Sequence, residues 1–301
     1  MSLVSLILLI VLPHLEEAPT PVVSEPPASL RDRLNLSPTY VKFLDVHGFP
    51  ILGSAKVSDY AMKEAAYLVS NMLEGREDVL REMARNKTRL AVMASTEMTT
   101  DVPEHADLEP KAYWDRRARG LGATRRRPAV SCAEENLLRL KGDPYRTENI
   151  LIHEFAHAIL QMGLEPLDPD FGKRVRQTYR QAMDEGLWKG KYAATNYHEY
   201  WAEGVQSWFD TNRENDRDHN HVNTREELKE YDPRLAALIA EVFGDRTWRY
   251  VRPEDRAEPA HLEGFDRASA PGFAWPEGLE EQPRRTTRKI GEDDEIRKDS
   301  P

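Results

Sequence analysis

The sequence has a single cysteine, Cys132, among its 301 residues. One cysteine excludes an intrachain disulfide, so a packed core must stabilise the fold. A thiolate at this position would be an internal ligand able to mask a metal ion. A lone cysteine is more often a small buried apolar residue, and this is the role that we expect for Cys132.

The chain also has no excess of basic residues. Its 42 Lys and Arg residues are outnumbered by 52 Asp and Glu residues, and the formal net charge is -10. No basic stripe stands out beyond Arg125-Arg126-Arg127. A phosphate backbone would be repelled overall, which argues against a nucleic-acid partner.

No apolar run in the sequence is long enough to span a membrane, which requires about 20 residues. The run from Leu3 to Leu12 has the length of the apolar part of a secretion signal, although no Lys or Arg precedes it. Val22-Val23-Ser24 is a possible cleavage site. We therefore expect a signal-like segment over residues 1–17, a Pro-rich linker over 18–34 and export of the protein, with a cytoplasmic location as the alternative.

The most informative motif is His153-Glu154-Phe155-Ala156-His157. Helical residues four apart share one face, so His153 and His157 can present two imidazole nitrogens to one metal ion. Glu154 then lies beside the metal, where a carboxylate can take a proton from the attacking water. The flanking residues are apolar almost all round and predict a buried helix, in which unpaired polar groups are costly. Metal binding is therefore favoured over a structural hydrogen-bond network.

A catalytic zinc ion takes three protein ligands and keeps one position open. The metzincin class would need Gly at position 160 and His at 163, but Leu160 and Gly163 stand there. That class is excluded. The remaining kind of third ligand is a Glu from a second helix downstream.

Residues 196–205 are expected to form such a helix, with Glu199 and Glu203 on one face. Glu199 would complete the ligand set. Glu203, one turn on, would accept the N–H of a metal-bound imidazole and fix its tautomer, and we assign that imidazole to His153.

The segment from Tyr192 to Glu203, read after the histidine motif, resembles the gluzincin peptidases of the anthrax lethal factor type, which include the bacterial Pro-Pro endopeptidases. Their pattern is Y-x(3)-N-x-x-E-[FY]-[FYW]-A-E, and the match is specific over residues 146–210. The resemblance implies one zinc ion per chain, bound by His153, His157 and Glu199. It also implies that Glu154 is the general base and that the Tyr192 phenol stabilises the oxyanion. Glu203 would be a carboxylate placed behind the ligands.

The order of expected elements is compatible with the fold that this resemblance implies over residues 35–252. That fold is α+β and zincin-like, with two lobes: a small twisted sheet and the active-site helix, then a mainly helical lobe. Strands are expected within 40–52, 88–94 and 128–132, and helices from Ser58 to near Gly75, around 175–183 and over 232–243. The histidine helix is expected to stop at Gly163. The polar composition of residues 253–301 predicts a disordered tail.

In zinc peptidases of this shape, an extended substrate pairs with the edge strand. We therefore expect residues 129–131 to be that edge strand and residues 120–122 to form a mobile lip beside it. His198 would point about 100 degrees away from Glu199 around the helix, which indicates a rim residue rather than a ligand. His219 and His221 lie in a segment that fails the calcium-loop pattern, and a polar loop is expected there.

The leading hypothesis is a zinc-dependent endopeptidase acting on a peptide or protein substrate. An inactive zincin-fold binding module is one alternative, but the chain retains Glu154, the expected base. A zinc hydrolase of another bond, such as a deacylase, or an aminopeptidase is a further alternative. Pro-Pro specificity is not implied, because subsites lie on loops that vary freely within a fold.

Overall fold

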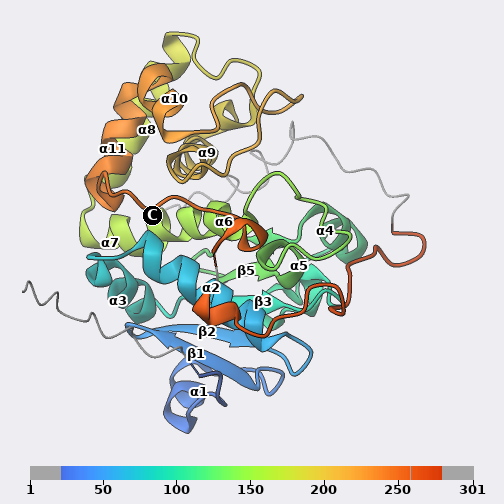
Figure 1. Cartoon of the computed structure of the whole chain (residues 1–301). Coiled ribbons are helices and arrows are strands. Elements are labelled where there is room, and N and C mark those ends of the chain that lie inside the picture. Colours follow the sequence, from blue (N-terminus) through green and yellow to red (C-terminus); the bar gives the residue numbers. More distant parts are fainter. Residues whose placement is uncertain (1–21, 258, 280–301) are drawn as a thin grey trace, which may run out of the picture.

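The framework of the protein is a five-stranded mixed sheet with the order β1-β2-β3-β5-β4 (Figure 1). The computed structural model describes residues 22–257 and 259–279. The strands are β1 (Lys42–Val46), β2 (Phe49–Gly53), β3 (Arg89–Met93), β4 (Gly120–Leu121) and β5 (Ala129–Ala133). Strands β2, β3 and β5 run parallel, and the outer strands β1 and β4 are antiparallel to their neighbours. The predicted α+β class is confirmed.

The three parallel strands are buried on both faces, which explains their mainly apolar sequences. Because side chains alternate along a strand, Leu90 and Val130 enter the large core while Ala91 and Ala133 enter a small cluster on the opposite face. The sheet therefore separates two apolar clusters of unequal size.

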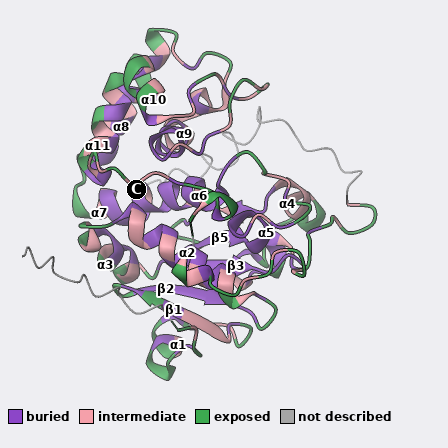
Figure 2. Ribbon diagram, in the orientation of Figure 1, coloured by how far each residue is buried: buried purple, intermediate pink, exposed green. Residues whose placement is uncertain are grey.

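Helices α2 (Asp59–Met72), α3 (Glu77–Arg85) and α6 (Ile150–Ala158) lie against the face of the large core. Helix α2 begins as predicted, because the Ser58 side chain accepts a hydrogen bond from the Tyr60 N–H. Figure 2 shows that the sheet and α6 are largely buried, whereas exposed residues line the outer helices. The histidine helix is thus central, as its apolar sequence indicates.

Helix α6 does not stop at Gly163, so this prediction was wrong. The chain continues as a π-helix over Ile159–Leu164 and then as α7 (Glu165–Leu167). A Cβ atom on Gly163 would lie 2.6 Å from Val79 Cγ1 of α3. The glycine permits a close approach of two helices instead of ending one.

On the other side of α6 lie α8 (Phe171–Asp184), α9 (Tyr197–Trp208), α10 (Arg225–Tyr231) and α11 (Pro233–Phe243) (Figure 1). Helix α9 packs against both α6 and α11. The structure adds α10, which the sequence interpretation missed. Its signal was present, because Thr224 and Glu227 form a capping box at its start.

The amino-terminal part of the described chain differs from the expected linker. Ser24 exchanges two backbone hydrogen bonds with Phe43, at 3.1 and 2.7 Å. Residues Ala28–Leu34 then form α1, which buries Leu30 and Leu34. Two leucines four residues apart are enough to hold this short helix against the protein, despite the Pro-rich surroundings. The signal-like segment, residues 1–17, lies outside the described residues.

The carboxyl-terminal part also differs from the expected tail over residues 253–279. The Glu64 carboxylate on α2 accepts hydrogen bonds at 2.7 Å from both Nη atoms of Arg256 and lies 2.7 Å from His261 Nε2. Phe273 is buried, and its N–H donates to the carbonyl of Lys141. The amino-acid composition did not predict that this segment packs on the protein, because only a few contacts, widely spaced in the sequence, hold it. Residues 280–301 lie outside the described part.

Among the helices that the structure describes, none combines the length and apolarity needed to cross a bilayer.

Candidate metal centre

Two asparagine side chains fix the start of α6. Asn149 Oδ1 accepts from the Ile152 N–H at 3.0 Å, and Asn136 Oδ1 accepts from the Ile150 N–H at 2.8 Å. These caps satisfy amide groups that would otherwise be unpaired in the buried first turn. The positions of His153 and His157 along the helix are thereby set.

A third asparagine performs the same task for α9. Asn196 Oδ1 accepts from the N–H groups of His198 and Glu199, at 2.9 and 3.0 Å. The next residues anchor the opposite side of the helix: Tyr200 donates its hydroxyl to Asp232 at 2.7 Å, and Trp201 Nε1 donates to the Ala156 carbonyl of α6 at 3.0 Å. With that side of α9 held, Glu199 faces the two histidines.

The three predicted ligand atoms form a nearly equilateral triangle. His153 Nε2 lies 3.1 Å from His157 Nε2 and 3.1 Å from Glu199 Oε2, and His157 Nε2 lies 3.3 Å from the same oxygen. A tetrahedron whose corners are about 2.0–2.1 Å from its centre has edges of about 3.3–3.4 Å. The triangle has the dimensions of one face of such a tetrahedron.

This donor set can hold a metal ion. It is the one group of three or more His, Cys, Asp or Glu residues with converging ligand atoms in the described part of the chain. Two imidazoles and one carboxylate suit zinc, and a tetrahedral ion bound to three protein atoms retains one open position. The residues therefore fit a metal ion such as zinc with one position left open.

The ionisation of the site reflects the close approach of these groups. Burial opposes a charge on His153, but the hydrogen bond to Glu199 and the nearby Glu154 raise the pKa of His153 well above its ordinary value. Burial likewise opposes a charge on Glu199, but His157 and His153 hold the pKa of Glu199 well below its ordinary value. The carboxylate is thus ionised at neutral pH, as a ligand must be.

Glu154 projects from α6 beside the triangle and is half-buried. Among the described residues, none donates a hydrogen bond to its carboxylate. The adjacent β4 segment leaves room for it, because a Cβ atom on Gly122 would lie 3.4 Å from Glu154 Oε2 and 2.9 Å from His157 Cβ. An unengaged carboxylate is therefore available next to the metal position.

Tyr192 begins a short 3₁₀ helix, Tyr192–Ala194, just before α9. Its N–H donates to the Asp218 carbonyl at 2.8 Å, and its ring lies 6.2 Å from the His153 ring, centroid to centroid. Burial and the nearby Glu199 raise the pKa of the Tyr192 hydroxyl well above its ordinary value. The hydroxyl is therefore a hydrogen-bond donor at neutral pH.

The hydrogen-bond partner of His153 is not Glu203, as predicted, but Gln206. His153 Nδ1 lies 2.7 Å from Gln206 Oε1, whereas Glu203 Oε1 is 3.6 Å away. Gln206 follows Glu199 by seven residues and so shares its helical face, which is the signal that could have found it. The prediction overlooked Gln206 because its side chain is an amide, whereas the expected partner was a carboxylate.

Glu203 has partners of its own. It lies 3.3 Å from His219 Nε2 and accepts from Asn212 Nδ2 at 3.1 Å. The expected polar loop thus contains a buried residue, since His219 is 6% exposed. Burial alone would lower the pKa of His219, but its contacts with Glu203 and Asp216 raise that pKa to about 8.

The other candidate side chains are not ligands. The His198 ring lies 3.9 Å from the Tyr197 ring, with the two planes tilted by 33°, and 6.5 Å from the His157 ring, in keeping with a rim position. His221 is exposed and contacts the Tyr231 ring. Cys132 is fully buried on β5, where burial raises the pKa of its thiol. As expected, Cys132 is a core residue.

The structure adds one cation that the sequence interpretation missed. Arg117 ends α4 (Lys111–Arg117), three residues before β4, and its guanidinium lies over the Trp114 ring at 5.4 Å. Burial alone would lower the pKa of Arg117, but the nearby Tyr192, Tyr113 and Glu154 raise it overall. A positive charge is therefore held close to the carboxylates of Glu154 and Glu199.

The expected edge strand is also different. Residues 129–131 belong to β5, which is paired on both sides, with β3 and with β4. Residues 120–121, expected as a lip, form β4 itself and are the outer strand on this side. The two-residue β4 gave no periodic signal, so the sequence could not reveal that it covers β5.

No protein-family model and no curated protein matches the sequence. Among solved structures, the fold is similar to that of the Pro-Pro endopeptidase from Paenibacillus alvei, with a TM-score of 0.44 and 16% sequence identity. The alignment covers 64% of this chain and 97% of the endopeptidase chain.

Proposed function

We propose that this protein is a zinc-dependent endopeptidase. One observation carries the proposal: two imidazole nitrogens and one carboxylate oxygen form a tetrahedral face, with separations of 3.1, 3.1 and 3.3 Å, beside the unengaged carboxylate of Glu154. A structural site would use four protein ligands, whereas a hydrolytic site needs three ligands, an open position and a base.

The chemistry assigns a task to each side chain. His153, His157 and Glu199 would hold the zinc ion, which would supply a Lewis acid able to lower the pKa of water toward neutrality and to polarise a carbonyl. Glu154 takes the proton of the attacking water and then delivers it to the leaving amine. The Tyr192 hydroxyl donates a hydrogen bond to the oxygen on which negative charge develops.

The free edge of the sheet at β4 supports an extended peptide as the substrate. Strand β4 ends beside Glu154 and His157, and its outer side faces no further strand within the described residues. An extended peptide can add to this edge through backbone hydrogen bonds, which would bring its carbonyl groups past the metal position. Gly122, which follows β4, keeps a side chain away from the site, because a Cβ atom there would lie 2.9 Å from His157 Cβ.

The test is digestion of a diverse peptide library by the purified, zinc-loaded protein, read by mass spectrometry. Glu154→Gln removes the base without changing the size of the side chain, and Glu230→Gln, at an exposed position of α10, is its matched control. Cleavage by the parent and the control, but not by Glu154→Gln or the chelated protein, is the expected result.

Two other results would replace this proposal. Zinc binding without cleavage of any peptide would assign the protein to hydrolases of a different bond or to binding modules. Cleavage that persists in Glu154→Gln would place the base elsewhere.

A further inference from the structure

Gln206 lies at the base of the candidate metal centre, fully buried on α9. Its side-chain amide has partners at both ends. The oxygen Oε1 is 2.7 Å from His153 Nδ1, while the nitrogen Nε2 is 3.1 Å from Glu148 Oε2 and 3.4 Å from the Asn149 carbonyl. Both partners of the nitrogen come from the segment that leads into α6.

The donors and acceptors permit one orientation of this amide. A carboxylate and a carbonyl can only accept hydrogen bonds, so the NH₂ group of Gln206 must face Glu148 and Asn149. The Gln206 oxygen must then face His153, and an oxygen requires a donor opposite it. Nδ1 of His153 therefore carries the hydrogen. Nε2, which points into the ligand triangle, is therefore the nitrogen whose lone pair can be offered to a metal ion.

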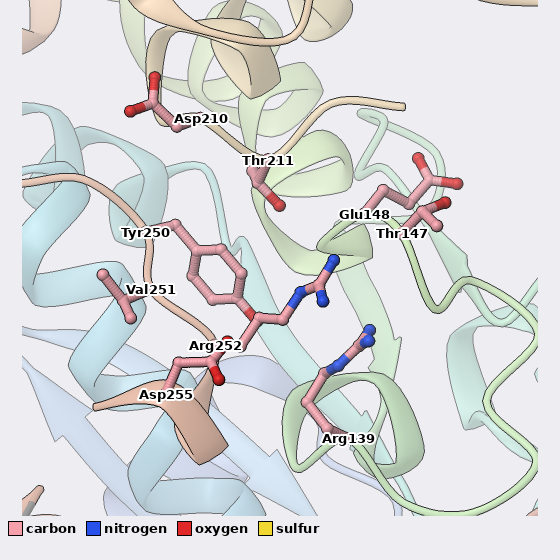
Figure 3. Close-up of a pocket in the computed structure, with 9 residues that line it drawn as sticks. All are labelled: Arg139, Thr147, Glu148, Asp210, Thr211, Tyr250, Val251, Arg252 and Asp255. Atoms are coloured by element: carbon pink, nitrogen blue, oxygen red, sulfur yellow. The ribbon is translucent and has the colours of Figure 1, made fainter. Parts of the chain in front are cut away.

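Glu148 is itself held in place. It is 8% exposed, its Oε1 lies 3.6 Å from Arg213, and it is one of the residues that line a cavity of about 240 Å³ (Figure 3). Glu203, which the motif suggested for this task, is instead engaged by Asn212 and His219. Glu148 at the cavity wall thus contacts Gln206, and Gln206 contacts His153 at the metal position.

We propose that Gln206, oriented by Glu148, is the positioning residue that fixes the His153 tautomer and thereby sets the affinity for zinc. This inference rests on the proposed function, because it assumes that the triangle holds zinc. Partners of metal-bound histidines commonly change metal affinity about 10–100-fold when they are removed.

A charge-exchanged pair provides the sharpest test. Gln206→Met removes all three side-chain hydrogen bonds and should weaken zinc binding about 10–100-fold. The double variant Q206E/E148Q reverses the two groups: the carboxylate at 206 then accepts from His153 and from the new amide at 148. Its zinc affinity should return to within a few-fold of the parent. Gln181→Met, on the exposed face of α8, is the matched control.

Zinc affinity is measured by competition with a chelator of known strength, and melting temperatures of the metal-free proteins check folding. Long-range ¹H–¹⁵N spectra of the zinc-loaded protein report the tautomer, and His153 should show a protonated Nδ1 and a metal-bound Nε2. Parent-like zinc affinity in folded Gln206→Met, failure of the folded double variant to recover, or a metal-bound Nδ1 would each overturn the inference.

These readouts need no peptide, so they are independent of peptidase activity. A parent protein that binds no zinc would refute the proposed function itself. A parent that binds zinc, with Gln206→Met binding it equally well, would refute only the role of Gln206.

Discussion

Replacing Tyr192 by Phe should separate catalysis from folding and from metal binding. No described residue makes a hydrogen bond with the Tyr192 hydroxyl, and its ring would keep its place beside His153, at a centroid distance of 6.2 Å. The folded ground state therefore loses no interaction. The whole effect should fall on the transition state, where one such donor contributes about 2.7–4 kcal/mol, or about 10²–10³-fold in kcat.

The assay is steady-state cleavage of the best peptide from the library, with zinc content and melting temperature measured on the same samples. Tyr60→Phe on α2 is the matched control. Since the pKa of Tyr192 is raised by burial and by Glu199, its hydroxyl stays protonated, and the rate ratio should be constant from about pH 6 to about pH 9. A loss of less than about threefold, or a loss of bound zinc, would refute the role of Tyr192.

Three further predictions concern stability and charge. Arg119 and Glu135 form an ion pair at 2.6 Å with both side chains 0% exposed, so Arg119→Met should cost about 3–5 kcal/mol and lower the melting temperature by roughly 6–20 °C. The double variant R119M/E135L should recover most of this loss, and an unchanged melting temperature in the single variant would contradict the argument. The pKa of His219 is raised from 6.5 to about 8, so its stabilisation is complete below pH 6.5 and is lost as the pH rises through about 8. In urea unfolding with chelator, the stability difference between the parent and His219→Gln should therefore shrink by about 2 kcal/mol from about pH 6 to about pH 9, and a constant difference would exclude the ion pair with Glu203. Arg117→Gln should lower kcat/KM with zinc content unchanged, because it removes the cation beside Tyr192, and an unchanged kcat/KM would leave Arg117 a packing role.

Local signals predicted where α2 and α9 begin. The start of α2 follows from Ser58, a side chain that caps the helix next to it. Helix α9 follows in the same way from Asn196. The position of β5 inside the sheet was not predictable from the sequence, because β4 has two residues and its pairing depends on contacts between distant segments. Gly163 misled the prediction for a related reason, since its role depends on Val79 of another helix.

The residues of the site show the same difference between local signals and contacts of distant segments. The spacing of His153 and His157 is a helical property, so it could be read directly. Glu199 required a motif, because it comes from another helix. For Gln206 the only signal was its place on the helical face of Glu199, since its role depends on Glu148, which lies 58 residues away in the sequence. Motif spacing reveals which atoms bind a metal more readily than which atoms orient the ligands.

The contact of Glu64 with Arg256 and His261 has a consequence for how the protein is made. Glu64 is fully buried on α2, near the start of the fold, yet its cationic partners stand 192 and 197 residues later in the sequence. A buried carboxylate without a partner destabilises a protein strongly. During synthesis, Glu64 therefore lacks these partners until almost the whole domain has left the ribosome. Proteolysis near residue 252 would remove these partners and return the protein to that unfinished state.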